Sequence, residues 1–257
     1  MVYASDIATH LDALLNVGAL PDYPGALNGL QLDHRGPVRA VAAAVDFSQR
    51  TVDATISAHA NFLILHHGMF WGGPQRIVGR TYERLHALWE HDIAVYASHL
   101  PLDAHPALGN NALLASSLGL HSSESFGEYE GSPIGVAGES EVPTATLLDR
   151  ARAFADPLGG TARASMLEDG RITRRWAIIT GAGASSGEIR LAQKAGIDTL
   201  IVGEGPHHTT VDAPDAGLVI IYAGHYATET LGVRALAEAV TTRFGVPSEF
   251  LLLPTGS

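Results

Sequence analysis

A pattern that occurs twice in the chain is the strongest constraint on its fold. The segment VAAAVDFSQRTVDATISAHANFLILHH (residues 41–67) aligns without a gap on IITGAGASSGEIRLAQKAGIDTLIVGE (residues 178–204). A second pair, YASHLPLD (residues 96–103) and YAGHYATE (residues 222–229), shares the pattern Tyr-Ala-x-His-x-x-x-acid. The repetition predicts two related halves that face each other across a pseudo-two-fold axis.

Strand and helix signals alternate within both copies. In the first copy, a buried-looking apolar run at 38–45 precedes a helix that Ser48 would cap, and a second apolar run follows at 62–65. In the second copy, strand signals at 176–180 and 199–202 lie on either side of a helical pattern. Alternation of this kind predicts an α/β fold.

The two copies divide the chain into three parts. We expect residues 1–120 to form a first α/β half and residues 171–257 a second half, which together complete one composite unit. Residues 121–170 match neither copy and are interpreted as a connecting segment, with a short strand near 134–137 and a helix near 144–154. This segment is too short for an independent catalytic domain.

Composition excludes several classes of function. The net charge of -11 argues against a long nucleic acid or an anionic membrane surface as a partner. The absence of cysteine rules out disulfides, thiolate zinc sites and cysteine nucleophiles. Residues 1–17 lack the basic and continuous apolar regions of a signal peptide, and no apolar stretch is long enough to span a bilayer. We therefore expect a soluble, cytoplasmic protein.

Polar side chains collect at the ends of the predicted strands, which is where open α/β sheets bind ligands. They are His66, His67, His99, Asp103, Glu204, His225 and Glu229. Neutral imidazole and carboxylate groups together suit zinc, iron, manganese or nickel. Because so many donors would crowd one ion, the set predicts two divalent ions that share a bridging carboxylate.

Each of these features also fits a structural role when it is taken alone. A histidine at a strand end often makes only hydrogen bonds, and Asp46 could either contact a ligand or cap the next helix. The glycine-rich turn at 181–187 could hold an anion at a helix N-terminus, and it fits a tight turn as well. His207 and His208 could carry protons or lie on a solvated loop. The metal hypothesis rests on the coincidence of donors at equivalent positions of the two copies.

Five blocks of sequence together resemble the Nif-three-like dinuclear-metal family, whose members are often labelled GTP cyclohydrolase type 2 homologues. The resemblance covers nearly the whole chain. The blocks are LNGLQL, LILHHGMFW, SHLPLDAHPALGNNALLASSLGL, IVGEGPHH and AGHYATETLGVRALAEA.

The resemblance implies a ligand set and an assembly. In that family, two metal ions are bound by the residues that match His66, His67, Asp103, His225 and Glu229 of this chain. His99 falls in a block that lies beside the site. The family also forms toroidal homohexamers whose metal sites face an internal cavity, so a homohexamer is expected.

These observations predict a dinuclear-metal-dependent hydrolase that uses a metal-activated water. The expected substrate is a small molecule such as a nucleotide, and the expected reaction opens a nitrogen heterocycle such as the imidazole ring of GTP. Glu204, His99 or His208 would move protons. Two alternatives stay open at this point: metal-dependent phosphoester hydrolysis, and a non-catalytic, ring-shaped metal-binding adaptor or chaperone.

Overall fold

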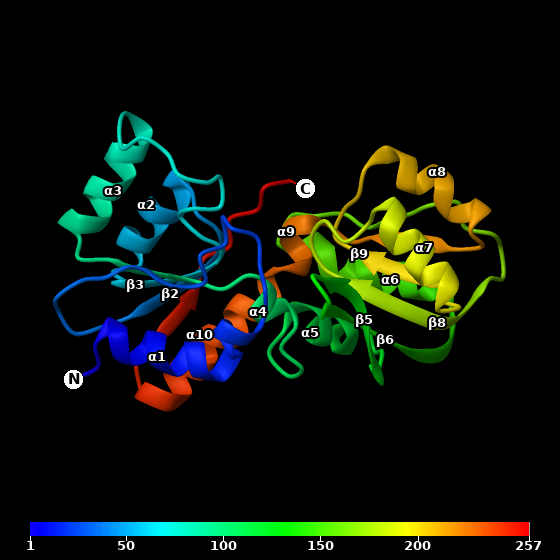
Figure 1. The fold of residues 1–257 in the computed structure, drawn as a ribbon, viewed down its shortest axis with the longest axis horizontal. Helices are drawn as coiled ribbons and strands as arrows, with labels where there is room; N and C mark the ends of the chain where they lie inside the picture. Colours follow the sequence, from blue (N-terminus) through cyan, green and yellow to red (C-terminus); the bar gives the residue numbers. More distant parts are fainter. Residues whose placement is uncertain (257) are drawn as a thin grey trace. The chain divides into compact units, whose positions relative to one another are not determined.

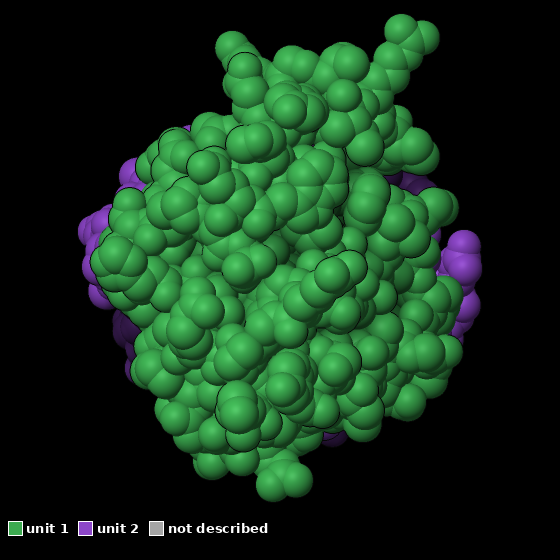
Figure 2. All heavy atoms as spheres, turned by 90° about the vertical axis from the view of Figure 1, so that its left-hand side faces the viewer, with its two compact units in different colours: residues 1–102, 232–253 green, residues 103–231, 254–257 purple. Residues whose placement is uncertain are grey.

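The structure is a computed structural model that describes residues 1–256, and it consists of two compact units. The first unit contains residues 1–102 and 232–253 (green in Figure 2), and the second contains residues 103–231 with the C-terminal residues from Pro254 (purple). The sequence-based division at residues 120 and 170 is defined by the internal repeat, whereas the two units are defined by which residues pack together in the folded chain. The predicted pseudo-two-fold relation stays a prediction.

The first unit is built on a five-stranded sheet with the order β1-β4-β3-β2-β11. Its inner strands run parallel to one another, and β1 pairs antiparallel to β4 at one edge. The strands are β1 (Gly29–Leu32), β2 (Val41–Asp46), β3 (Phe62–His67), β4 (Ala94–Ala97) and β11 (Ser248–Phe250). All six residues of β3 are buried, as expected for a parallel strand that is covered on both faces.

Helices cover both faces of this sheet. Figure 1 shows α2 and α3 on one side of β2 and β3, with α1 and α10 on the other. The helices of this part of the chain are α1 (Ala4–Leu15), the 3-10 turn Val17–Ala19, α2 (Gln49–Ser57), α3 (Arg80–Glu90), α4 (Leu100–Asp103) and α10 (Thr230–Phe244). Ser48 caps α2 as predicted, because its hydroxyl accepts a hydrogen bond from the backbone N of Thr51 at 3.2 Å.

The second unit is built on a six-stranded sheet with the order β5-β6-β8-β9-β10-β7. Strands β8, β9 and β10 are parallel, and the other pairings are antiparallel. The strands are β5 (Glu124–Tyr129), β6 (Ser132–Pro143), β7 (Arg163–Ala164), β8 (Ile172–Ile179), β9 (Thr199–Val202) and β10 (Val219–Tyr222).

Two apolar clusters lie on opposite faces of this second sheet. Trp176 and Ile178 of β8 pack with α5 and α6, whereas the alternate residues Ala177 and Ile179 pack with α7 and α8. The helices are α5 (Asn110–Ser117), α6 (Thr144–Ala155), the 3-10 turn Asp156–Leu158, α7 (Ser186–Lys194), α8 (His207–Asp215) and α9 (His225–Thr228). Two helix layers around each sheet confirm the predicted α/β fold.

Three local features differ from the sequence-based expectations. The short strand predicted near 134–137 is the twelve-residue strand β6, which joins the sheet of the second unit. The pair His207 and His208 does not lie on a loop, because it begins helix α8, directly after Pro206. The third concerns the segment after β10, where the Tyr-Ala-x-His-x-x-x-acid pattern ends at Glu229 in a break between the short helix α9 and the longer α10.

None of the helices within residues 1–256 combines the length and the apolar character that crossing a lipid bilayer requires.

Candidate metal centre

Three buried histidines gather at the carboxyl edge of the first sheet. His66 and His67 end strand β3, and His99 follows β4 at the start of α4. Because β3 and β4 are parallel neighbours, the residues that follow them emerge at the same edge. The ring centroids of His66 lie 4.8 Å from His67 and 4.9 Å from His99. One nitrogen from each ring lies within 4.8 Å of the others, so the three residues form a group that could hold a metal ion.

The outer nitrogen of each of these rings has a fixed acceptor. Nδ1 of His66 lies 3.0 Å from the carbonyl oxygen of Ser98. Nδ1 of His67 lies 2.8 Å from Oδ1 of Asp46. In a neutral imidazole that donates through Nδ1, the lone pair is on Nε2, which is then the atom that can bind a metal. Acceptors of this kind orient the ring and increase the basicity of the ligating nitrogen.

His99 is held by a buried carboxylate from a distant loop. Its Nδ1 lies 2.7 Å from Oδ1 of Asp22, whose other oxygen accepts from the backbone N of Leu100 at 2.9 Å and from Asn28 at 2.8 Å. Burial pushes the pKa of Asp22 upward, but His99, Asn28 and the Leu100 amide together hold it below its ordinary value. Asp22 therefore stays ionised and fixes the orientation of the His99 ring.

A histidine and two carboxylates meet at the corresponding edge of the second sheet. His225 begins α9 directly after β10, and its Nδ1 lies 2.8 Å from Oε1 of Glu204. Its Nε2 lies 3.2 Å from Oε2 of Glu229, which is only 2% exposed. Burial lowers the pKa of His225, but Glu229 and then Glu204 outweigh that effect and raise it to about 9. The ring thus lies between two carboxylates, and this anionic environment would also favour a bound cation.

Gly181, in the turn after β8, makes room for this carboxylate. A Cβ on Gly181 would collide with Oε1 of Glu229 and lie 3.3 Å from Nε2 of His225. The backbone N of Gly181 donates to the hydroxyl of Thr228 at 3.1 Å. The glycine at 181, which also has a positive φ of 63°, is therefore explained by the close approach to Glu229.

The sequence of this chain matches the model of the family described as Duf34/NIF3 (NGG1p interacting factor 3), over residues 2–252. The chain belongs to the DUF34/NIF3 family. This membership confirms the resemblance that the sequence blocks indicate.

Curated relatives and solved structures agree with the assignment to the DUF34/NIF3 family. The protein from Deinococcus radiodurans is 38% identical over 253 residues, covering 98% of this chain and 93% of the relative. The protein from Halobacterium salinarum is 40% identical over 258 residues, covering 98% of each. Both relatives bear the name "GTP cyclohydrolase 1 type 2 homolog".

Two solved structures match along their whole length. The protein ybgI, described as of unknown function, is 33% identical with a TM-score of 0.89, and each chain is covered at 100%. TTHA1606 from Thermus thermophilus is 34% identical with a TM-score of 0.82, again with 100% of each chain covered. The DUF34/NIF3 fold therefore extends over this whole chain.

The structure accounts for the remaining residues that the sequence singles out. Asp103 is buried at the end of α4, where its Oδ1 accepts from Asn110 at 2.8 Å and lies 3.4 Å from the hydroxyl of Thr180. His208 lies on α8 with its Nε2 3.1 Å from the hydroxyl of Ser186. The roles predicted for Asp103 as a ligand and for His208 as a proton carrier stay predictions.

Two residues near the histidines are not among the candidate site residues that the sequence indicates. Asp22 holds His99 from a loop, 77 residues away in the chain. Trp71 packs its indole against the same rings, with centroid distances of 4.6 Å to His67 and 4.4 Å to His99. Asp46, which could have capped the next helix, instead holds His67, and Ser48 provides the cap.

Proposed function

We propose that this protein is a metal-dependent hydrolase with a dinuclear centre. The proposed ligands are those that the DUF34/NIF3 resemblance implies, namely His66, His67, Asp103, His225 and Glu229. One observation carries the proposal: each histidine of the two groups has its Nδ1 on a fixed acceptor, a carbonyl oxygen for one and carboxylates for the others. Metal-ligating histidines are oriented in this way.

The residues fit divalent metal ions by their chemistry. Buried imidazole and carboxylate donors, in a chain without cysteine, suit zinc, iron, manganese or nickel. A purely structural histidine would need only its hydrogen bonds. In His66, His67 and His99, by contrast, one nitrogen of each ring lies within 4.8 Å of a nitrogen of the other two. His99 is therefore proposed as an additional donor or as a group that shapes the site.

Bound divalent ions would lower the pKa of a coordinated water toward neutrality and polarise the bond under attack. The chain would supply orientation and proton transfer. Glu204 is the best proton carrier of the three residues considered, because it contacts His225 and its side chain is 50% exposed to solvent. His99 is less suited, since Asp22 fixes it in a buried position. Glu229, buried beside His225, is the proposed bridging carboxylate.

The proposed substrate is a small molecule with a nitrogen heterocycle, such as the imidazole ring of GTP. The names of the curated relatives support this choice. Hydrolysis would add the oxygen of water to the ring carbon and leave the ring nitrogen protonated as the C–N bond breaks. The net charge of -11 disfavours a long nucleic acid as the substrate.

We also propose a cytoplasmic homohexamer, which sedimentation analysis of the full chain would test.

The test uses protein that has been stripped with a chelator and reloaded with zinc, iron or manganese. Incubation with GTP should give a product heavier by one water, detected by mass spectrometry, only in the reloaded sample. Glu204→Gln should slow this turnover while the metal content is unchanged. Turnover of a nitrophenyl phosphodiester without ring opening would favour the phosphoester alternative. Full metal loading without turnover of either substrate would favour a metal-binding adaptor.

A further inference from the structure

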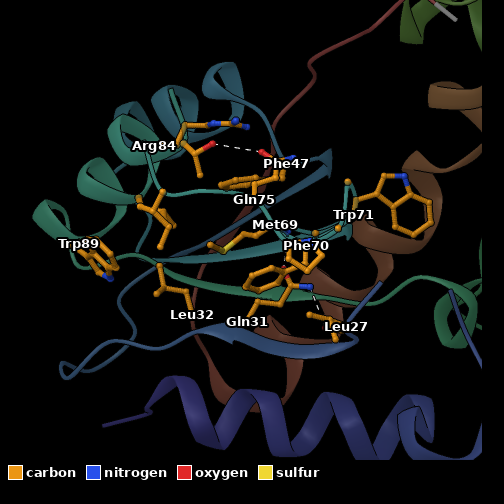
Figure 3. Close-up of a pocket in the computed structure, with 17 residues that line it drawn as sticks. Leu27, Gln31, Leu32, Phe47, Met69, Phe70, Trp71, Gln75, Arg84 and Trp89 are labelled. Atoms are coloured by element: carbon orange, nitrogen blue, oxygen red, sulfur yellow. Dashed lines mark hydrogen bonds between the residues drawn. The ribbon is translucent and has the colours of Figure 1, made fainter. Parts of the chain in front are cut away.

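The first unit contains a cavity that none of the three histidines lines, although Trp71, which packs against His67 and His99, is one of its lining residues. It has a volume of about 620 Å³, which is within the usual range for small-molecule sites. It lies between β1, helix α3 and the loop that follows β3. Figure 3 shows Met69 and Phe70 of that loop in its middle, with Phe47 above them and Trp89 at one end. The indole of Trp71 points away from these side chains in the same view.

The side chain of Gln31 holds in place the loop after β3, which forms one wall of the cavity. The side-chain oxygen of Gln31 accepts from the backbone N of Met69 at 2.7 Å, and its nitrogen donates to the carbonyl oxygens of Ala26 at 2.9 Å and Leu27 at 3.0 Å. A Cβ on Gly68 would collide with the same Gln31 side chain. The wall is therefore packed against a fixed group before any ligand arrives, which lowers the entropic cost of binding.

Among the described residues, the only charged side chain that lines the cavity is a cation. Arg84 of α3 lies with its guanidinium carbon 5.4 Å from the centroid of the Phe47 ring. Its Nε donates to the carbonyl oxygen of Arg80 at 3.4 Å, and no carboxylate pairs with it in the part of the chain that the structure describes. In a chain with a net charge of -11, a cation without an acidic partner beside aromatic rings favours an anionic group.

We propose that this cavity binds a small molecule that combines a planar aromatic or heteroaromatic ring with an anionic group. The ring would pack among Phe47, Phe70 and Trp89, since aromatic pairs add to the free energy of burial. The anion would meet Arg84. The site lies beyond the proposed hydrolase function, because none of the proposed metal ligands lines the cavity within residues 1–256.

The experiment measures binding of a fluorescent probe with this chemistry, anilinonaphthalene sulfonate, to the full chain. We expect saturable binding of one probe per chain, and weaker binding of the uncharged N-phenylnaphthylamine. Arg84→Gln and Phe70→Ala should each weaken binding of the sulfonate by about tenfold. Matched controls on the same helix are Arg80→Gln and Tyr82→Ala, which do not line the cavity and should leave binding unchanged.

Three results would overturn the proposal. The first is binding that Arg84→Gln and Phe70→Ala leave unchanged while circular dichroism shows that both variants are folded. The second is loss of probe binding when a chelator removes metal, because the probe would then bind at the metal centre. The third combines two observations: the wild type does not bind the probe, and both variants change their sedimentation coefficient. A second copy of the chain would then fill the cavity in the wild type. Binding that persists without metal supports the cavity even if the hydrolase proposal fails.

Discussion

Nδ1 of His67 lies 2.8 Å from Oδ1 of Asp46, and the same two residues face each other in the register between β2 and β3. The sheet itself therefore places the carboxylate that orients this ring. His99 obtains the same kind of partner from a loop, through Asp22 at 2.7 Å. In metal centres, a ligating imidazole often donates its other ring N–H to a carboxylate in this way.

Removing the carboxylate behind His67 should weaken metal binding. We expect Asp46→Ala to reduce the affinity for zinc by roughly 10–100-fold, because the ring loses its orienting acceptor. Asp46→Asn keeps an acceptor oxygen and should reduce it less. Competition with a chelating dye measures both variants. The control is Asp53→Ala, an exposed acid on α2 whose carboxylate accepts from Gln49, and an equal loss there would contradict the account.

A methyl group at position 181 should damage the site and not only the backbone. Gly181 and Gly196 both have positive φ values, of 63° and 70°, so alanine strains the backbone by about 1 kcal/mol at either position. Only at Gly181 would the added Cβ collide with Glu229, whereas nothing lies within 4 Å at Gly196. We expect a larger fall in melting temperature for Gly181→Ala than for Gly196→Ala, and loss of bound metal only in Gly181→Ala. Equal effects in the two variants would argue against the close approach.

The buried phenol of Tyr96 should make stability depend on pH in the alkaline range. Its hydroxyl donates to Oδ1 of Asp12 at 2.9 Å, and burial together with Asp12 raises the pKa of Tyr96 far above its usual range. The folded chain keeps this proton where the unfolded chain loses it, so the stabilisation is present below about pH 10 and is lost at higher pH.

The substitution Tyr96→Phe isolates that contribution. We expect it to lower the free energy of unfolding by about 1 kcal/mol near neutral pH, because a buried hydrogen bond is lost. The difference from the wild type should shrink above about pH 10, where the unfolded wild type gains stability by ionising. Urea unfolding followed at several pH values measures this. A difference that stays constant or grows would show that Tyr96 is not protonated in the folded chain under these conditions.

The indole of Trp71 should report on metal at the histidines. Because its ring lies 4.4 Å from His99 and 4.6 Å from His67, a paramagnetic ion such as Ni²⁺ bound there should quench its fluorescence. The quenching should be much reduced in Trp71→Phe, although Trp89 and the buried Trp176 remain. Titration with Ni²⁺ measures the effect, and Trp89→Phe serves as the control. Equal quenching in both variants would place the ion elsewhere.

The regular elements near the repeat could be predicted because local chemistry determines them. The apolar run that ends in His66 and His67 is a parallel strand buried on both faces, so periodicity and length are enough to identify it. Ser48 and Ser185 cap their helices through hydroxyl bonds to nearby backbone amides. The edge strand β5 has no comparable signal in the sequence, because its first two residues are exposed and its pattern is not strongly apolar.

The proposed ligands could be selected from sequence, but the groups that orient them could not all be. His66, His67 and His225 stand at strand ends, where the fold class itself indicates a ligand site. Asp22 lies on a loop with no periodic pattern, and only the folded chain brings it to His99. The role of Gly181 likewise depends on a contact with Glu229 that lies 48 residues further along the chain. Long-range contacts from loops leave no local signature.

Metal content per chain is the most direct test of the central claim. The protein should be purified without a metal-affinity tag, loaded with zinc, iron or manganese, and measured by mass spectrometry beside Glu229→Ala, His66→Ala and the exposed control His121→Ala. We predict about two ions per chain in the wild type and in His121→Ala, and fewer in the other two variants. Metal at background level in the wild type after loading would contradict the account, and the buried histidines would then serve only as hydrogen-bonding groups of the core.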